Sequence, residues 1–108
     1  MAKSKRTKAC EIPPKVREEV ERRDSVDGHP CCIFCGSPDA RGEGHFIKRS
    51  QGGLGIPKNL VTVCRDCHRE MDDGDNRKYY MEVAENYLRD HYPDWNKNDL
   101  IFKKGTWT

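Results

Sequence analysis

The stretch from residue 32 to residue 68 reads CIFCGSPDARGEGHFIKRSQGGLGIPKNLVTVCRDCH, and it carries one CxxC pair near each end. These pairs are Cys32 with Cys35 and Cys64 with Cys67. Structural zinc sites are tetrahedral and need four converging donors. A CxxC turn places two thiolates on one side of an ion, so two such turns close the coordination shell. We therefore expect one structural Zn²⁺ ion bound by these four cysteines.

The neighbouring cysteines leave one alternative for this site. Cys31 directly precedes Cys32 and could bind zinc in its place, but the two-residue spacing to Cys35 favours Cys32. Cys10 and Cys31 are then spare thiols. Redox CxxC pairs sit at the start of a helix in a thioredoxin-like context, and the short segment after Gly28 does not predict such a helix.

The composition favours a small domain that needs a staple. Only 34% of the 108 residues are hydrophobic and 35% are charged, so the core is thin and a metal would supply stability. We expect a basic disordered arm at residues 1–10 and a single domain at 11–108, with its core at 30–74 and a C-terminal helix and tail at 75–108. The N-terminus lacks a secretory signal and no apolar run could span a membrane. We therefore expect a cytoplasmic chain with no membrane partner, in a compartment that keeps thiols reduced.

Hydrophobic spacing and turn residues predict the order of the elements. Strands are expected at 44–48 and 60–63, with a glycine-rich loop between them. Helices are expected near residues 13–24, 66–72 and 76–91. Pro93 ends the last helix, and the apolar residues Trp95, Leu100, Ile101 and Phe102 are expected to fold back onto the core.

Two polar side chains of interest lie in the segment between the CxxC pairs, and a third directly follows the second pair. That segment is longer than the about 15–20 residues of a simple zinc ribbon. His45 falls on the first predicted strand, Asn59 just before the second, and His68 directly after the last cysteine. The runs GHFIKRSQGG at 44–53 and NLVTVCRDCH at 59–68 resemble the motif of the HNH endonucleases in its zinc-stapled form.

The resemblance implies a small α+β fold: a ββα-metal, treble-clef-like core with a structural four-cysteine zinc, flanked by N- and C-terminal helices. It implies that His45 is the general base, that Asn59 holds the strand carrying that base, and that His68 is a metal ligand. A histidine with an ordinary pKa near 6.5 is a competent base at neutral pH. The implied activity is metal-dependent hydrolysis of DNA phosphodiester bonds, by nicking or double-strand cutting with low sequence specificity.

The resemblance also implies a divalent ion at the site. Asp72 lies four residues after His68, hence on the same helix face, where relatives place a second ligand. Many relatives carry a ligand directly before the base, but Gly44 stands there, and Glu43 is a weaker substitute. Nitrogen and oxygen donors with open positions suit Mg²⁺ or Mn²⁺.

The expected partner is DNA. The net charge is only +2, but basic residues gather around the candidate site and suit contacts to the DNA backbone: Lys48, Arg49, Arg65 and Arg69. The likeness to small bacteriophage nucleases implies a phage-encoded protein in the host cytoplasm, with a phage terminase or other packaging protein as a partner. The alternative is a zinc-stabilised module that binds DNA or protein without catalysis.

Overall fold

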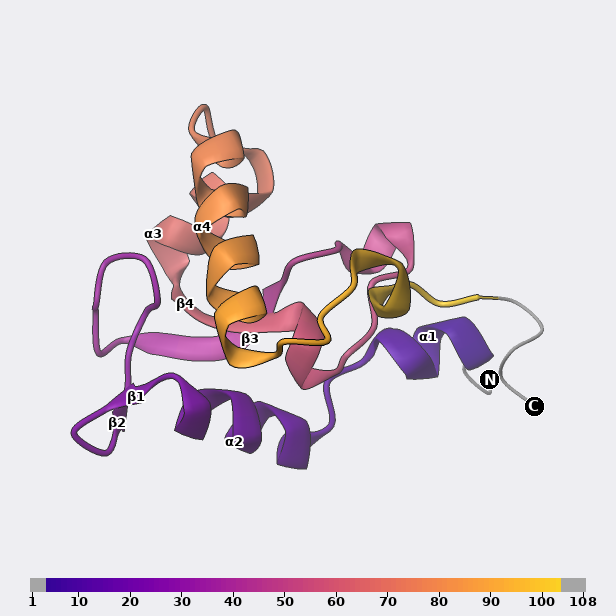
Figure 1. Cartoon of the computed structure of the whole chain (residues 1–108), viewed down its shortest axis with the longest axis horizontal. Helices are drawn as coiled ribbons and strands as arrows, with labels where there is room; N and C mark the ends of the chain where they lie inside the picture. Colours follow the sequence, from indigo (N-terminus) through magenta and orange to yellow (C-terminus); the bar gives the residue numbers. More distant parts are fainter. Residues whose placement is uncertain (1–3, 104–108) are drawn as a thin grey trace.

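The computed structural model describes residues 4–103 (Figure 1). The helices are α1 (Lys5–Cys10), α2 (Pro14–Arg23), α3 (Arg65–Asp73) and α4 (Arg77–His91), and the strands are β1 (Ser25–Val26), β2 (His29–Pro30), β3 (Ala40–His45) and β4 (Leu60–Cys64). Short 3₁₀ turns are η1 (Arg49–Gln51), η2 (Pro57–Asn59) and η3 (Lys97–Leu100). The predicted α+β class is confirmed.

The centre of the fold is the β3–β4 hairpin followed directly by α3. The two strands are antiparallel, with His45 opposite Leu60 and Ala40 opposite Cys64. Cys64 caps α3, so the chain passes from strand to helix without a linker. In the view of Figure 1, α2 lies below the hairpin, while α3 and α4 pack together above it. This strand–strand–helix unit confirms the predicted ββα arrangement.

The core forms where α4 meets the hairpin and the C-terminal tail. Ala84 and Leu88 of α4 are buried, as the predicted apolar stripe requires. Trp95 and Leu100 are buried in the same cluster, and the indole of Trp95 donates a hydrogen bond to the Lys58 carbonyl oxygen at 2.7 Å. The prediction that the tail folds back is confirmed for these residues.

The predicted disordered arm at residues 1–10 is wrong for residues 5–10, which form α1. The Ser4 hydroxyl caps the helix by accepting a hydrogen bond from the Thr7 N–H. At the other end of the helix the Cys10 side chain is only 3% exposed, and its burial helps to offset the entropy cost of ordering this short helix. Residues 1–3 of the predicted arm lie outside the described residues.

The first strand of the hairpin also differs from the expectation of residues 44–48. It begins at Ala40 and ends at His45. Gly42 and Gly44 hide the alternation of side chains that identifies a strand, and a register shift between Arg41 and Gly44 interrupts the ladder. The strand therefore delivers His45 at its end, where the hairpin opens.

A buried ion pair ties three elements together. The Asp24 carboxylate accepts hydrogen bonds from the Arg23 guanidinium at 2.7 Å, from the Thr62 N–H at 2.8 Å and from the Tyr87 hydroxyl. Arg23 also donates to the carbonyl oxygen of Leu60 at 2.7 Å. The Arg23–Asp24 pair thus joins the end of α2 to β4 and α4.

Candidate active site

Four cysteine side chains meet between the knuckle at residues 32–35 and the start of α3. The sulfur atoms of Cys32, Cys35, Cys64 and Cys67 all lie within 4.8 Å of one another, and Cys35 and Cys64 are 3.6 Å apart. Zinc–sulfur bonds of 2.3 Å in a tetrahedron place the sulfurs about 3.8 Å apart. The cluster therefore has the donors and the spacing that Zn²⁺ requires.

The structure also decides between the two adjacent cysteines. Cys32 is buried in the cluster, whereas the thiol of Cys31 donates to the carbonyl oxygen of His29 at 3.3 Å. Gly36 has a φ of 79°, and a left-handed residue there lets the chain turn back after Cys35. The predicted choice of Cys32 over Cys31 agrees with this geometry.

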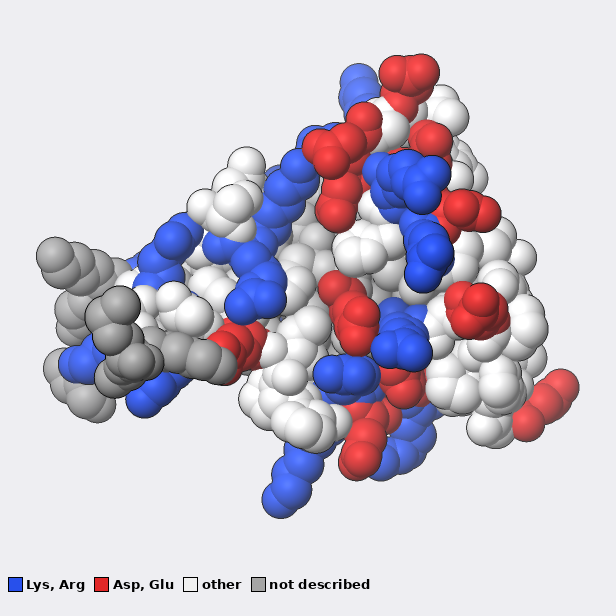
Figure 2. Space-filling view, turned by 180° about the vertical axis from the view of Figure 1, so that it is seen from behind, with Lys and Arg blue, Asp and Glu red and all other residues white. Residues whose placement is uncertain are grey.

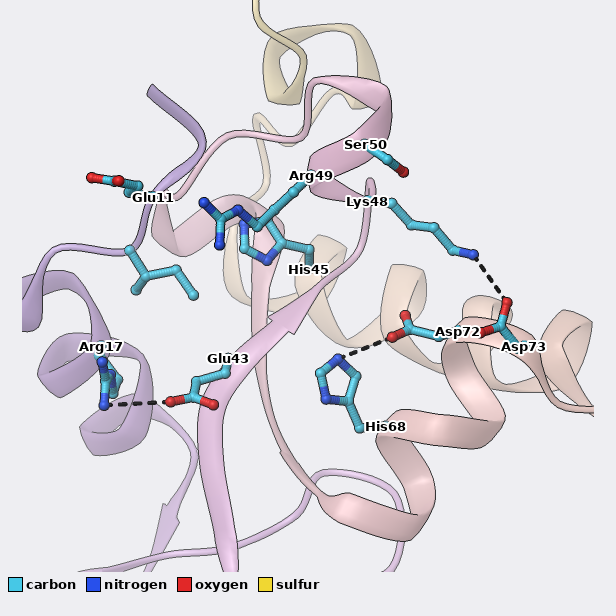
Figure 3. A pocket seen from close by; sticks show the side chains of 11 residues that line it. Glu11, Arg17, Glu43, His45, Lys48, Arg49, Ser50, His68, Asp72 and Asp73 are labelled. Carbon is cyan, nitrogen blue, oxygen red and sulfur yellow. Dashed lines mark hydrogen bonds and ion pairs between the residues drawn. The ribbon is translucent and has the colours of Figure 1, made fainter. Parts of the chain in front are cut away.

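A pocket of about 690 Å³ opens at the His45 end of β3, away from the end where Ala40 pairs with Cys64. Figure 3 shows side chains from four parts of the chain around it: the segment after α1, α2, the β3–η1 region and α3. Its polar lining includes Glu43, His45, Lys48, Arg49, His68 and Asp72. The predicted base and the predicted metal ligands thus line one pocket.

His45 is the most buried ionisable side chain of the pocket, at 8% exposure. Its Nε2 lies 3.1 Å from the carbonyl oxygen of Cys10. A carbonyl oxygen only accepts, so Nε2 carries the proton and Nδ1 is the basic nitrogen of the neutral ring. Burial lowers the pKa of His45 below its ordinary value, and the positive charge of Arg49 beside it (Figure 3) acts in the same direction.

Asn59 does not line the pocket but holds the backbone beside it. The side chain is fully buried, with 0% exposure. Its Oδ1 accepts from the Ile47 N–H at 2.8 Å, and its Nδ2 donates to the carbonyl oxygens of Leu54 at 2.9 Å and Ile47 at 3.2 Å. Asn59 therefore pins both ends of the loop that follows His45.

His68 and Asp72 face each other across one turn of α3. Their Nε2 and Oδ2 atoms are 3.3 Å apart (Figure 3). Two donors bound to one ion at about 2.1 Å lie about 3.0–3.4 Å apart in octahedral or tetrahedral geometry. This pair therefore fits two adjacent coordination positions.

A metal-binding side chain at position 44, where many relatives carry one, would have no room in this fold. A Cβ at position 44 would lie 2.9 Å from the Val63 side chain, so this position faces β4 and not the pocket. Glu43, one residue earlier, does line the pocket and pairs with Arg17 of α2 at 3.4 Å. Sequence reasoning missed Arg17, because one arginine in a charged helix gives no signal of what it faces.

The four predicted DNA contacts divide into two groups. Lys48 and Arg49 line the pocket, and Lys48 pairs with Asp73 at 3.5 Å. Arg65 and Arg69 are exposed on α3 and do not line it. Figure 2 shows basic and acidic side chains interleaved over one face of the molecule, so positive charge is local rather than spread over that face.

Comparison with known proteins points to one family. The family model described as HNH endonuclease matches residues 32–74, which confirms the resemblance seen in the sequence. A comparison with curated proteins found no match. None of the helices within residues 4–103 is long and apolar enough to cross a membrane.

A solved structure shows the same fold. It is a type IV phosphorothioation-dependent restriction endonuclease, ScoMcrA, which superposes with a TM-score of 0.57 at 21% identity. The match covers 83% of this chain and 19% of the restriction enzyme, so this chain spans about a fifth of that protein's length.

Proposed function

We propose that the chain is a metal-dependent DNA endonuclease with low sequence specificity, in keeping with the match of residues 32–74 to the HNH endonuclease family model. One observation carries the proposal: His45, His68 and Asp72 line the same pocket, together with cationic side chains suited to phosphate. A pure binding module needs neither a buried neutral imidazole nor a histidine–carboxylate pair opposite it.

His45 is the general base in this proposal. Its unprotonated Nδ1 takes the proton of a water molecule as the water oxygen attacks phosphorus. The bond from phosphorus to the 3′ oxygen breaks, and that oxygen is protonated from solvent. A positioned base contributes about 10²–10⁴-fold to such a rate. Burial keeps the imidazole neutral and therefore competent at neutral pH.

Asn59 is a positioning residue. It touches neither the pocket nor the reacting atoms, but its three hydrogen bonds hold Ile47 and Leu54. The backbone oxygen of Asn59 also accepts from the Phe46 N–H at 2.8 Å, directly after the base. Its side chain therefore limits how far His45 can move.

His68 and Asp72 would hold the catalytic ion, with Glu43 as a weaker third candidate. Mg²⁺ or Mn²⁺ suits this donor set, and the ion supplies charge neutralisation on the phosphate and the leaving oxygen. Glu43 is paired with Arg17, so its use as a ligand would require this ion pair to open. The four cysteines hold a separate structural Zn²⁺.

Phosphate binding falls to the basic residues at the pocket and along α3. Lys48 and Arg49 stand at the pocket wall and would bind the scissile phosphate. Arg65 and Arg69 lie on the same helix, one before and one directly after His68, and would bind flanking phosphates. Such contacts carry no sequence information, which supports low specificity.

Supercoiled plasmid tests the activity. With Mg²⁺ or Mn²⁺ the wild-type protein is expected to produce nicked circles, and linear DNA later if both strands are cut. A zinc-loaded, folded protein that never relaxes the plasmid in any divalent metal between pH 6 and 9 would contradict the proposal. His45→Ala separates a nuclease from a binding module, since a binding module has no activity to lose.

Mn²⁺ binding tests the ligands without using activity. Asp72→Asn is expected to weaken Mn²⁺ binding, measured by electron paramagnetic resonance of the free ion, by tenfold or more. Asp75→Asn is the matched control, because Asp75 is exposed and lies outside the pocket. Equal Mn²⁺ affinity in both variants would exclude Asp72 as a ligand.

A phage origin and a link to genome packaging stay predictions from the resemblance. Their test is the same plasmid assay with purified terminase added. A packaging partner is expected to change the rate or the product, and an unchanged reaction over a range of terminase concentrations would argue against it.

A further inference from the structure

The segment from residue 4 to residue 12, here called the N-terminal strap, touches the active site although it lies outside the matched residues 32–74. We propose that the strap is a working part of the active site, in which the backbone carbonyl of Cys10 positions His45 and fixes its tautomer. The inference rests on the proposed role of His45 as a base.

The contact between Cys10 and His45 is short and sheltered. The Nε2–oxygen distance is 3.1 Å, and both residues are buried. A neutral imidazole carries one ring proton, and the Cys10 carbonyl, as an acceptor at Nε2, holds that proton on Nε2. Without it, the proton is free to move to Nδ1, which then cannot accept a proton from water.

The strap is fixed to the loop that Asn59 also fixes. The Gly55 N–H donates to the carbonyl oxygen of Ala9 at 3.0 Å, and the Arg6 guanidinium donates to that of Ser50 at 2.9 Å. Glu11 and Ile12 then form part of the pocket wall. In Figure 3 the strap passes close to His45 on the side away from α3.

Gly55 is the residue that permits this approach. A Cβ at position 55 would collide with the carbonyl oxygen of Glu11, which is backbone and cannot turn aside. Gly55→Ala therefore pushes the strap away from the loop, and it alters neither a cysteine nor a side chain of the pocket wall. Thr7→Ala is the matched control, because Thr7 is exposed on α1 and the Ser4 cap to the Thr7 N–H survives.

The first test reads the tautomer directly by ¹⁵N–¹H correlation spectroscopy of the histidine rings, in the full zinc-loaded chain. The His45 signals are assigned by their loss in His45→Gln. In wild type and in Thr7→Ala, neutral His45 is expected as the Nε2–H tautomer. In Gly55→Ala, and in a chain that lacks residues 1–10, the signals are expected to shift towards the Nδ1–H form.

Two results would overturn the proposal. One is a neutral His45 that carries its proton on Nδ1 in the wild type. The other is an unchanged Nε2–H pattern in the folded, zinc-loaded chain without residues 1–10. If that truncated chain does not fold, Gly55→Ala decides, because an unchanged His45 pattern there would equally contradict the role of the strap.

Cleavage kinetics on a short DNA duplex give the second test. Gly55→Ala is expected to lower kcat by tenfold or more while KM stays within about twofold, since a general base contributes about 10²–10⁴-fold. Thr7→Ala is expected to keep both constants. An inactive wild-type protein would refute the proposed function but leave the spectroscopic result intact, so the two ideas fail separately.

Discussion

Asn59→Ala is expected to lower the free energy of unfolding by about 3–5 kcal/mol. The substitution removes three hydrogen bonds: a buried one to Leu54 at 2.9 Å and two partly buried ones to Ile47 at 2.8 and 3.2 Å. It leaves the backbone groups of both residues without these partners. Each such bond contributes about 0.5–1.5 kcal/mol net, and a buried group left without a partner costs about 1–3 kcal/mol. A domain of this size has about 5–15 kcal/mol in total, so the loss is a large fraction of its stability.

Urea denaturation of the zinc-loaded protein, followed by circular dichroism, measures this loss. Asn86→Ala is the control, because Asn86 is exposed on α4, and its change should stay within about 0.5 kcal/mol. Asn59→Ala should also cut DNA far more slowly under conditions where it is folded. A loss of less than about 1 kcal/mol for Asn59→Ala would show that Asn59 does not hold this loop.

Three further outcomes are expected. Removal of zinc by a strong chelator should abolish cooperative unfolding, because metal binding supplies about 10–16 kcal/mol of folding energy in small zinc domains; a cooperative transition after verified zinc loss would contradict this. Burial lowers the pKa of His45, so the acid limb of the pH profile of kcat/KM should have its midpoint below 6.5, and a midpoint above 6.5 would refute the assignment of His45 as the base. For the same reason the free energy of unfolding should fall as the pH drops from 6.5 through the folded-state pKa of His45, because the unfolded chain binds more protons in that range. In the same urea assay Asp24→Ala should lower the free energy of unfolding by about 3–5 kcal/mol, because it leaves the buried Arg23 charge without its partner. Asp90→Ala is the control, since Asp90 is exposed, and an equal loss in both variants would show that the Arg23–Asp24 pair does not stabilise the fold.

The ββα core was predictable because its signals are local. Two CxxC pairs at fixed spacing, β-branched residues in β4 and a helical repeat in α4 each follow from neighbouring residues. The choice of Cys32 over Cys31 also followed from spacing alone. His45 and His68 were found because the runs at 44–53 and 59–68, which contain them, resemble the HNH motif.

Features that depend on distant segments were not predictable. Six charged or small residues at 5–10 read as a disordered arm, and only docking on the loop that contains Gly55 makes them a helix. Asp24 looked like a helix end, although it anchors a pair buried by α4 and β4. Gly44 looked like a missing ligand, but its position faces Val63 and offers no route to the pocket.

If His45 is the base of a metal-dependent nuclease, its removal must slow the chemical step of cleavage without preventing DNA binding. Wild type and His45→Ala are compared in single-turnover nicking of plasmid with saturating Mn²⁺, after equal zinc content and equal circular dichroism are established. We expect His45→Ala to cut about 10²–10⁴-fold more slowly than the wild type while it still binds the plasmid. Cleavage by His45→Ala at a rate within threefold of the wild type would contradict the role of His45 as the base.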